Sequence, residues 1–332
     1  MFSRKIAIDL GTVNSLVYVM GEGVVLSEPT VVALSEEDDK ILAIGIAARD
    51  MLGKTPQNIV SVKPVKYGVI ADYLTTESLL RYFINKVVGR TRFIKPDVLL
   101  SVPAGATSVE SRAVLDAVYA AGAKNAYLMP EPLAAAIGTG LPIAEPSGNM
   151  VVNIGGGTSE IAIVSLYGIV AHGSVKIAGN NLDESIIQYV KREYNLIIGD
   201  MTAERVKIRI GSAFPVDNDM SLEVKGRDSI TGFPRTITLT TNEVVKCIRS
   251  NLNQIALGIK DVLEKTPPEL SSDIIDKGIV LCGGTALLKN LDKYLTDYVG
   301  VPVHVADDPL QCVVKGLGIA LENLNLFKKS LK

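Results

Sequence analysis

Ile8-Asp9-Leu10-Gly11-Thr12 and Asn153-Ile154-Gly155-Gly156-Gly157-Thr158 are two copies of one glycine-rich hairpin, and they lie 144 positions apart from Asp9 to Asn153. A β-rich run enters each turn and a second one leaves it, at residues 5–8 and 16–20 in the first copy and at 150–152 and 161–166 in the second. Glycine lets successive backbone N–H groups point into one concavity and lets the main chain approach a phosphate closely. Because internal repetition reports architecture, the duplication predicts two phosphate-binding loops that face one cleft.

Composition limits the class of protein. A chain of 332 residues with 47% apolar and 21% charged residues is typical of a globular protein of roughly two domains. Its net charge of −2 gives no electrostatic footprint for nucleic acid, so we predict no nucleic-acid partner. Three widely spaced cysteines and two histidines favour a reducing cytoplasm and argue against structural zinc. Neither a secretory signal nor an apolar run of ~18 to 20 residues is visible.

Strand and helix signals alternate along the chain, which predicts α/β layers. Residues 98–102 are a short apolar run typical of a buried strand, and Thr107 to Glu110 after it has the capping-box spacing that begins a helix. A second capping box, Thr240 to Glu243, begins a long amphipathic helix that Pro267-Pro268 ends. Polar stretches at 35–40 and 217–219 indicate the edges of small inserted lobes.

Three glycine-containing segments resemble the motifs of one superfamily. Residues 9–12, the glycine run from Gly155, and 281–285 are similar to the two phosphate motifs and the adenosine motif of the actin, sugar-kinase and heat-shock-chaperone ATPases. Within that superfamily the chain resembles the MreB family of bacterial actins nearly end to end, in segments 28–33, 68–72, 131–132, 146–152 and 265–270. The resemblance implies an actin-like α/β fold, in which two duplicated lobes, each with a small inserted subdomain, surround a nucleotide cleft.

That fold implies a division of the chain into four parts. The first large lobe would hold the first phosphate loop, and the second would hold the other phosphate loop and the adenosine motif. The predicted bounds are 1–32, 74–140 and 313–332 for the first large lobe, 33–73 for its small subdomain, 141–178 and 243–312 for the second large lobe, and 179–242 for its small subdomain.

The first hairpin contains a candidate magnesium-binding carboxylate. Asp9 follows an apolar strand, where it could hold the water shell of Mg²⁺ or simply cap a turn, and the duplicated context favours magnesium. Thr12, Asn14 and Ser15 offer donors to phosphates and could also stabilise the turn. The resemblance implies that ATP and Mg²⁺ bind in the cleft and that the nucleotide contacts Asp9, Gly11, Thr12, Val13, Asn14, Ser15, Gly155, Gly156, Gly157, Thr158, Glu204, Arg205, Val206, Lys207, Gly283, Gly284, Thr285, Ala286 and Leu287.

Glu204 and Lys207 are three positions apart, which places them on one face of a predicted helix. Spacing alone would favour an exposed surface ion pair. The resemblance implies that this face covers adenine and ribose, opposite the turn at Gly283 and Gly284.

Glu131 is the candidate catalytic residue, because the resemblance implies that a glutamate between two prolines here positions the water that attacks the γ-phosphate. Thr158 would help to orient that water. Such residues act mainly by placement, since phosphoryl transfer needs little covalent help from the protein. The alternative for Glu131 is a carboxylate at a helix N-terminus, favoured there by the helix dipole.

Three positions depart from the family pattern. Asn153 stands where both the pattern and the internal repeat lead us to expect aspartate, and a neutral amide has one acceptor oxygen where a carboxylate has two charged ones. Asn153 should therefore hold the water shell of the metal less firmly, which slows hydrolysis more than binding. Cys282 and Thr285 replace a threonine and a glycine of the adenosine motif, and Thr285 has less backbone freedom than glycine.

A local membrane signal lies at residues 90–95. Phe93 and Ile94 stand between basic residues, the composition of a shallow interfacial anchor, although they could instead enter the core. The resemblance implies a membrane-inserting loop here, and Phe2 could add to it. One molecule would bind weakly, whereas a filament would bind through avidity.

Together the resemblance implies a bacterial actin that forms a homopolymer, with paired protofilaments, on the inner face of the cytoplasmic membrane. It would work with the cell-elongation machinery to organise wall synthesis and rod shape, as a slow Mg²⁺-dependent ATPase. The alternative is a nucleotide-binding filament scaffold with little or no hydrolysis, because Asn153 replaces an acidic residue.

Overall fold

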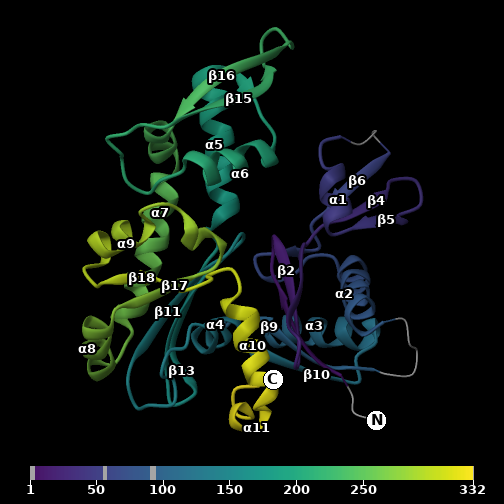
Figure 1. The fold of residues 1–332 in the computed structure, drawn as a ribbon, viewed down its shortest axis with the longest axis vertical. Helices are drawn as coiled ribbons and strands as arrows, with labels where there is room; N and C mark the ends of the chain where they lie inside the picture. The colour runs from purple at the N-terminus through teal and green to yellow at the C-terminus, as the bar shows by residue number, and fades with distance from the viewer. Residues whose placement is uncertain (1–3, 55–57, 90–94, 332) are drawn as a thin grey trace.

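The computed structural model describes residues 4–54, 58–89 and 95–331 of the chain. Strands and helices alternate into two large lobes side by side, with a smaller unit above each of them (Figure 1). The α/β class predicted from the sequence is therefore confirmed. Among the described residues no helix is both long and apolar enough to cross a membrane.

The first large lobe is built on a five-stranded sheet in the order β10-β9-β1-β2-β3. Its first hairpin pairs antiparallel strands, and β9 and β10 extend the sheet in parallel from β1. Alternation along β1 sends Ile6 and Ile8 to one face and Ala7 to the other. The strands are β1 (Lys5–Leu10), β2 (Asn14–Val19), β3 (Gly23–Pro29), β9 (Asp97–Val102) and β10 (Asn125–Pro130), and helices α2 (Tyr73–Val88) and α3 (Ser108–Ala121) cover the Ile6 face.

The second large lobe repeats this sheet. Its order, β13-β12-β11-β17-β18, again places an antiparallel hairpin beside parallel strands, so the duplication seen in the sequence is a duplication of topology. The strands are β11 (Asn149–Ile154), β12 (Ser159–Ser165), β13 (Gly168–Val175), β17 (Ile279–Cys282) and β18 (Val303–Val305), packed with helices α5 (Gly179–Tyr194), α7 (Thr241–Glu264), α8 (Pro268–Lys277) and α9 (Leu291–Val299).

Both predicted capping boxes begin helices. Thr107 accepts from the Glu110 N–H at the start of α3, and Thr240 accepts from the Glu243 N–H at the start of α7. Helix α7 ends at Glu264, before the proline pair. These local signals were sufficient to place two of the helices that build the lobes.

Two helices connect the lobes, α4 (Glu131–Gly138) and α10 (Cys312–Glu322). They pack against inward residues of both sheets in a single apolar cluster. A Cβ added at Gly138 would lie 1.8 Å from the Cys312 carbonyl oxygen, and one at Gly316 would lie 1.8 Å from that of Ala134. The two helices therefore touch backbone to backbone, and the first residue of α4 is the candidate catalytic Glu131.

The small subdomains lie at the same end of the molecule (Figure 1). One is a three-stranded sheet with a short helix, and the other is a three-stranded sheet beside helices α5 and α6. Their elements are β4 (Val32–Ser35), β5 (Ile41–Ile44), β6 (Ile59–Val62) and α1 (Ile46–Met51) in the first, and β14 (Leu196–Ile197), β15 (Ser221–Asp228), β16 (Pro234–Thr240) and α6 (Asp200–Ile210) in the second. The residue numbers at which the four parts divide stay a prediction.

The remaining elements are short. A two-stranded ribbon precedes α2, a 3-10 turn follows β17, and a short helix lies near the C-terminus. They are β7 (Val65–Lys66), β8 (Val69–Ile70), η1 (Gly284–Leu287) and α11 (Leu324–Phe327).

Candidate functional site

A cavity of about 390 Å³ lies between the lobes, where the turns of both glycine hairpins meet. The predicted convergence of the two loops is therefore confirmed. The predicted residues that line it are Asp9, Gly11, Thr12, Val13, Asn14, Glu131, Asn153, Gly155, Gly156, Gly157, Thr158, Glu204, Lys207, Gly283, Gly284, Thr285 and Leu287.

The glycines of the second loop are required by its contact with the first. A Cβ at Gly156 would lie 2.1 Å from Val13 Cγ2, and one at Gly157 would lie 2.7 Å from Thr12 Oγ1. A side chain at either position would fill the space between the loops. The missing Cβ atoms therefore let the second loop approach the Val13 and Thr12 side chains of the first loop closely.

The cavity lining also includes large apolar side chains. Ile208, Leu287 and Leu310 line it and remain 68%, 57% and 49% exposed. The Thr285 hydroxyl donates to the Gly155 carbonyl at 2.7 Å, so this departure from the family pattern ties the adenosine motif to the second phosphate loop.

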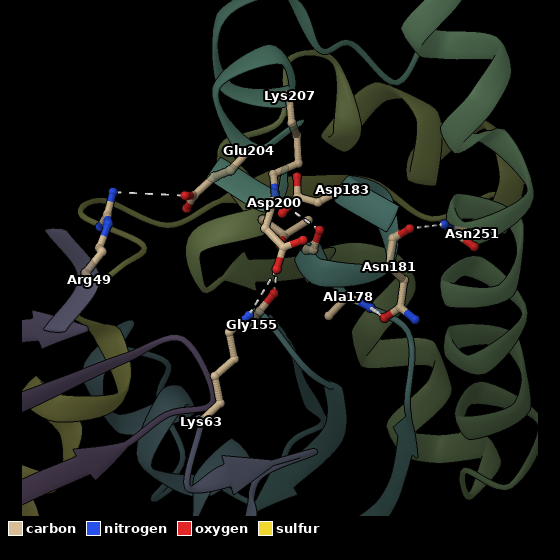
Figure 2. A network of polar contacts seen from close by, with 12 residues as sticks. Arg49, Lys63, Gly155, Ala178, Asn181, Asp183, Asp200, Glu204, Lys207 and Asn251 are labelled. Carbon is tan, nitrogen blue, oxygen red and sulfur yellow. Dashed lines mark hydrogen bonds and ion pairs between the residues drawn. The ribbon is translucent and has the colours of Figure 1, made fainter. Parts of the chain in front are cut away.

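Glu204 and Lys207 both lie on α6, as their spacing predicted, and both line the cavity, as the resemblance implied. Lys207 Nζ is engaged by the protein: it donates to the Gly179 carbonyl at 3.0 Å and to Asp183 Oδ2 at 2.8 Å (Figure 2). Burial raises the pKa of Asp183 to about 6, although the charge and hydrogen bond of Lys207 lower it. Within the described part of the chain, Asp183 Oδ1 is buried without a hydrogen-bond partner.

Four predicted contact residues lie outside the cavity lining. The Ser15 hydroxyl is buried and hydrogen-bonded to that of Thr30 at 2.8 Å. Val206 and Ala286 are buried in the core of the second lobe, and Arg205 is exposed on α6. Sequence reasoning also missed lining residues, among them Gly179, Asn180, Asp183, Ile208, Lys289, Leu310 and Val313. Ile208 lies four positions after Glu204 on α6, so the spacing that places two residues on one helix face could have indicated it.

Two of the candidate catalytic residues, Glu131 and Asn153, contact each other in the lining of the cavity. Asn153 Nδ2 donates to Glu131 Oε1 at 2.5 Å, and Asp9 Oδ1 accepts from the Ser101 hydroxyl at 2.8 Å. Burial raises the pKa of Glu131 well above its usual range, the charges of Glu160 and Asp9 raise it further, and the bond from Asn153 lowers it. Burial also raises the pKa of Asp9 to about 6, against the lowering effect of Ser101. This concentration of buried carboxylates favours a nearby cation.

In the described ranges, no group of three or more His, Cys, Asp or Glu side chains could hold a metal ion directly. The predicted membrane residues Phe2, Phe93 and Ile94 lie outside the described residues.

The chain is similar to known proteins over its whole length. A family model described as MreB/Mbl protein matches residues 3–329. The cell shape-determining protein Mbl of Bacillus subtilis (strain 168) is 48% identical over 329 residues, 99% of each chain. The cell shape-determining protein MreB of Escherichia coli (strain K12) is 48% identical over 332 residues, which cover 98% of this chain and 95% of that protein.

Solved structures are also similar to this chain. The crystal structure of MreB5 of Spiroplasma citri bound to AMPPNP has a TM-score of 0.94 and 37% sequence identity, covering 99% of each chain. The crystal structure of MreB5 of Spiroplasma citri bound to ADP has a TM-score of 0.93 and 38% sequence identity, covering 98% of each chain. The MamK double helical filament, at 20% identity and a TM-score of 0.80 over 96% of this chain and 99% of that one, shares the fold. The chain therefore belongs to the MreB/Mbl family and has the actin-like fold.

Proposed function

We propose that this protein binds Mg²⁺-ATP in the cavity between the lobes and assembles into filaments that determine cell shape. The observation that carries the proposal is the meeting of the two glycine loops around one cavity of about 390 Å³. Two relatives with nearly the same fold are bound to AMPPNP and to ADP, which supports a nucleotide as the occupant.

Different residues of the cavity lining would bind different parts of the nucleotide, according to their chemistry. The backbone of Gly11 and of 155–157 would hold the phosphates, and the apolar wall that includes Ile208 and Leu287 would hold the base. Asp9 and Asn153 would hold the water shell of the metal. When bound, the metal ion would neutralise charge on the phosphates.

Hydrolysis would depend on Glu131, which lies at the start of α4 in the cavity wall. One of its oxygens is already engaged by the Asn153 amide at 2.5 Å. That bond leaves one carboxylate oxygen to position the attacking water, with Thr158 beside it in the lining. We propose slow hydrolysis for this reason, with a filament scaffold that does not hydrolyse ATP as the second candidate, favoured by the same amide.

Phosphate release and sedimentation, measured on the same samples, separate the two candidates. The ATPase predicts nucleotide-dependent pelleting accompanied by slow phosphate release, and it predicts that Glu131→Ala abolishes the release while pelleting persists. Glu264→Ala, which removes an exposed carboxylate at the end of α7, is the matched control and should behave as the parent. Pelleting with no release from the parent would favour the scaffold, and no pelleting would contradict both.

We further propose that the filaments are paired protofilaments on the inner face of the cytoplasmic membrane, where they organise the cell-elongation machinery. The names of the relatives, cell shape-determining proteins, support this role. Phe93 and Ile94 lie between Arg92 and Lys95 in the sequence, which supports contact with an anionic surface, and Phe2 would add to it.

A further inference from the structure

The turn between β7 and β8 lies against the first glycine loop. Tyr67 and Gly68 are the two residues between the paired strands. Gly68 lines the cavity, and its N–H donates to Thr12 Oγ1 of the first glycine loop at 3.2 Å. A Cβ added at Gly68 would lie 2.7 Å from Pro103 Cγ, just after β9. The turn is therefore held between the first glycine loop and the segment that follows β9.

Tyr67 has an unusual backbone conformation for a bulky residue. Its φ is 51° and that of Gly68 is 73°, so both residues lie in the left-handed region. A two-residue hairpin turn with two positive φ angles favours Asn-Gly or Asp-Gly, because a bulky side chain is sterically disfavoured there. The turn itself therefore gives no reason for a tyrosine at this position, and the reason must lie in what its ring contacts.

The ring of Tyr67 contacts the second lobe. Lys176, just after β13, places its Nζ 5.5 Å from the centroid of the Tyr67 ring, within the range of a cation–π contact. The β7–β8 ribbon itself belongs to the first lobe, because Val65 is buried in the core of that lobe. Hydrogen bonds from Thr107 lower the pKa of Glu110 on α3, and the charge of Lys176 adds to the lowering. Lys176 therefore reaches from the second lobe to two groups of the first.

A second contact between the lobes joins the same segments. Glu160 on β12 is buried, and its carboxylate accepts from the Ser174 hydroxyl at 2.5 Å and from the Ala104 N–H at 3.4 Å. Ser174 lies on β13, two residues before Lys176. Ala104 directly follows Pro103, the residue that packs against the turn. The second lobe therefore holds both the β7–β8 turn and the segment behind it.

We propose that Tyr67 and Lys176 are positioning residues of the nucleotide site, whose contact holds the β7–β8 turn against the first glycine loop and keeps the two lobes together around the cavity. The nucleotide in this statement rests on the proposed function, whereas the contact between the lobes does not. Loss of the contact should free the turn, weaken the hydrogen bond from the Gly68 N–H to Thr12 and let a bound nucleotide leave faster. Because the Tyr67 side chain is 47% exposed, the effect should be that of an exposed cation–π contact, about 2- to 5-fold.

The first test measures hydrogen exchange of the Gly68 amide in the full-length protein without nucleotide, as a protection factor corrected for the neighbouring side chain. Lys176→Gln should lower the protection factor about 2- to 5-fold, and Lys176→Arg, which keeps a cation, should restore it. Tyr67→Phe keeps the ring and should also match the parent. Lys246→Gln, which makes the same change at an exposed position on α7, is the matched control.

Tyr67→Asn separates the contact from the turn. Asparagine adopts the left-handed region more readily than tyrosine, so protection would rise if position 67 served the turn alone. The proposal predicts that protection falls, because the ring is lost.

The second test measures release of a fluorescent ATP analogue from the same variants in the presence of Mg²⁺. Lys176→Gln and Tyr67→Asn should release it about 2- to 5-fold faster than the parent, and Lys176→Arg and Tyr67→Phe at the parental rate. Parental protection in Lys176→Gln, or higher protection in Tyr67→Asn, would overturn the proposal whatever the nucleotide does. Lower protection with parental release would overturn the role in the nucleotide site. A parent that does not bind the analogue would contradict the proposed function, and the exchange result would still decide whether the contact holds the turn.

Discussion

Two ion pairs cross the mouth of the cleft and join the small subdomains (Figure 2). Arg49 on α1 lies 4.0 Å from Glu204 on α6, and Lys63, just after β6, lies 3.7 Å from Asp200 at the start of α6. One partner of each pair belongs to each small subdomain, so both pairs favour the closed arrangement. We predict that removing them speeds the release of nucleotide.

The size of the effect follows from the exposure of the four side chains, which ranges from 32% for Glu204 to 79% for Asp200. Exposed pairs contribute about 0.2 to 1 kcal/mol each, so the two together contribute roughly 0.4 to 2 kcal/mol. A free-energy change of ~1.4 kcal/mol corresponds to a factor of ten, so the ratio of open to closed molecules should rise about 1.4- to 5-fold when one pair is lost and about 2- to 30-fold when both are lost. Because salt screens exposed charges, the difference should shrink at ~1 M salt.

The assay is stopped-flow release of a fluorescent ATP analogue from Lys63→Glu, from Asp200→Lys and from the double variant that exchanges the two charges. Each single variant should release faster than the parent at low salt, and the exchange should restore slow release. Lys225→Glu, which makes the same change at an exposed position on β15, is the matched control. Parental release rates in the single variants, or no restoration by the exchange, would refute the role of these pairs.

Three further outcomes are expected. Asn153→Asp should speed phosphate release, because it frees Glu131 from the amide at 2.5 Å and adds a charged acceptor for the water shell of the metal. The gain should grow as pH rises, since at low pH the two neighbouring carboxyls would share a proton. Slower release at every pH would contradict this. The pKa of Asp183 is about 6 in the folded state against 3.8, so its contribution to stability is fully present below pH ~4 and is lost as pH rises through 6. The free energy of unfolding of Asp183→Asn, measured in urea, should therefore rise relative to that of the parent by up to ~3 kcal/mol between pH 4 and 7. Parallel pH dependences of the two proteins would contradict this. Changing Phe93 and Ile94 to serine should remove filaments from anionic vesicles without a large loss of thermal stability, and such a loss would mark them as core residues.

The elements of the fold that were predicted from the sequence are those whose signals come from residues close together in the chain. Capping boxes begin α3 and α7. The two predicted hairpins are the antiparallel pairs β1–β2 and β11–β12, each with a glycine-containing turn between its strands. Backbone periodicity could also have excluded two predicted contacts. Ser15 follows Asn14 in a strand, so its side chain points to the opposite face, and Val206 lies on the core side of α6 while Lys207 lies on the cavity side.

The contacts that sequence did not predict join residues far apart in the chain. The partner of Lys207 is Asp183, on the neighbouring helix α5, and the Thr285 hydroxyl finds the Gly155 carbonyl across the second lobe. Asn153 was interpreted as a weaker acceptor, whereas its amide nitrogen is the donor to Glu131. Such contacts depend on how the elements dock, and no spacing or propensity in a single sequence reports that.

Calorimetric titration of Mg²⁺-ATP into the parent and into Gly156→Val tests the central claim, that ATP binds between the glycine loops. The valine would place a Cβ 2.1 Å from Val13 Cγ2, so the two loops must move apart and binding should be lost, while circular dichroism of the free protein stays close to that of the parent. Gly105→Val, where an added Cβ would meet nothing within 4 Å, is the control and should bind as the parent does. Parental affinity in Gly156→Val, or no ATP binding by the parent, would contradict the account.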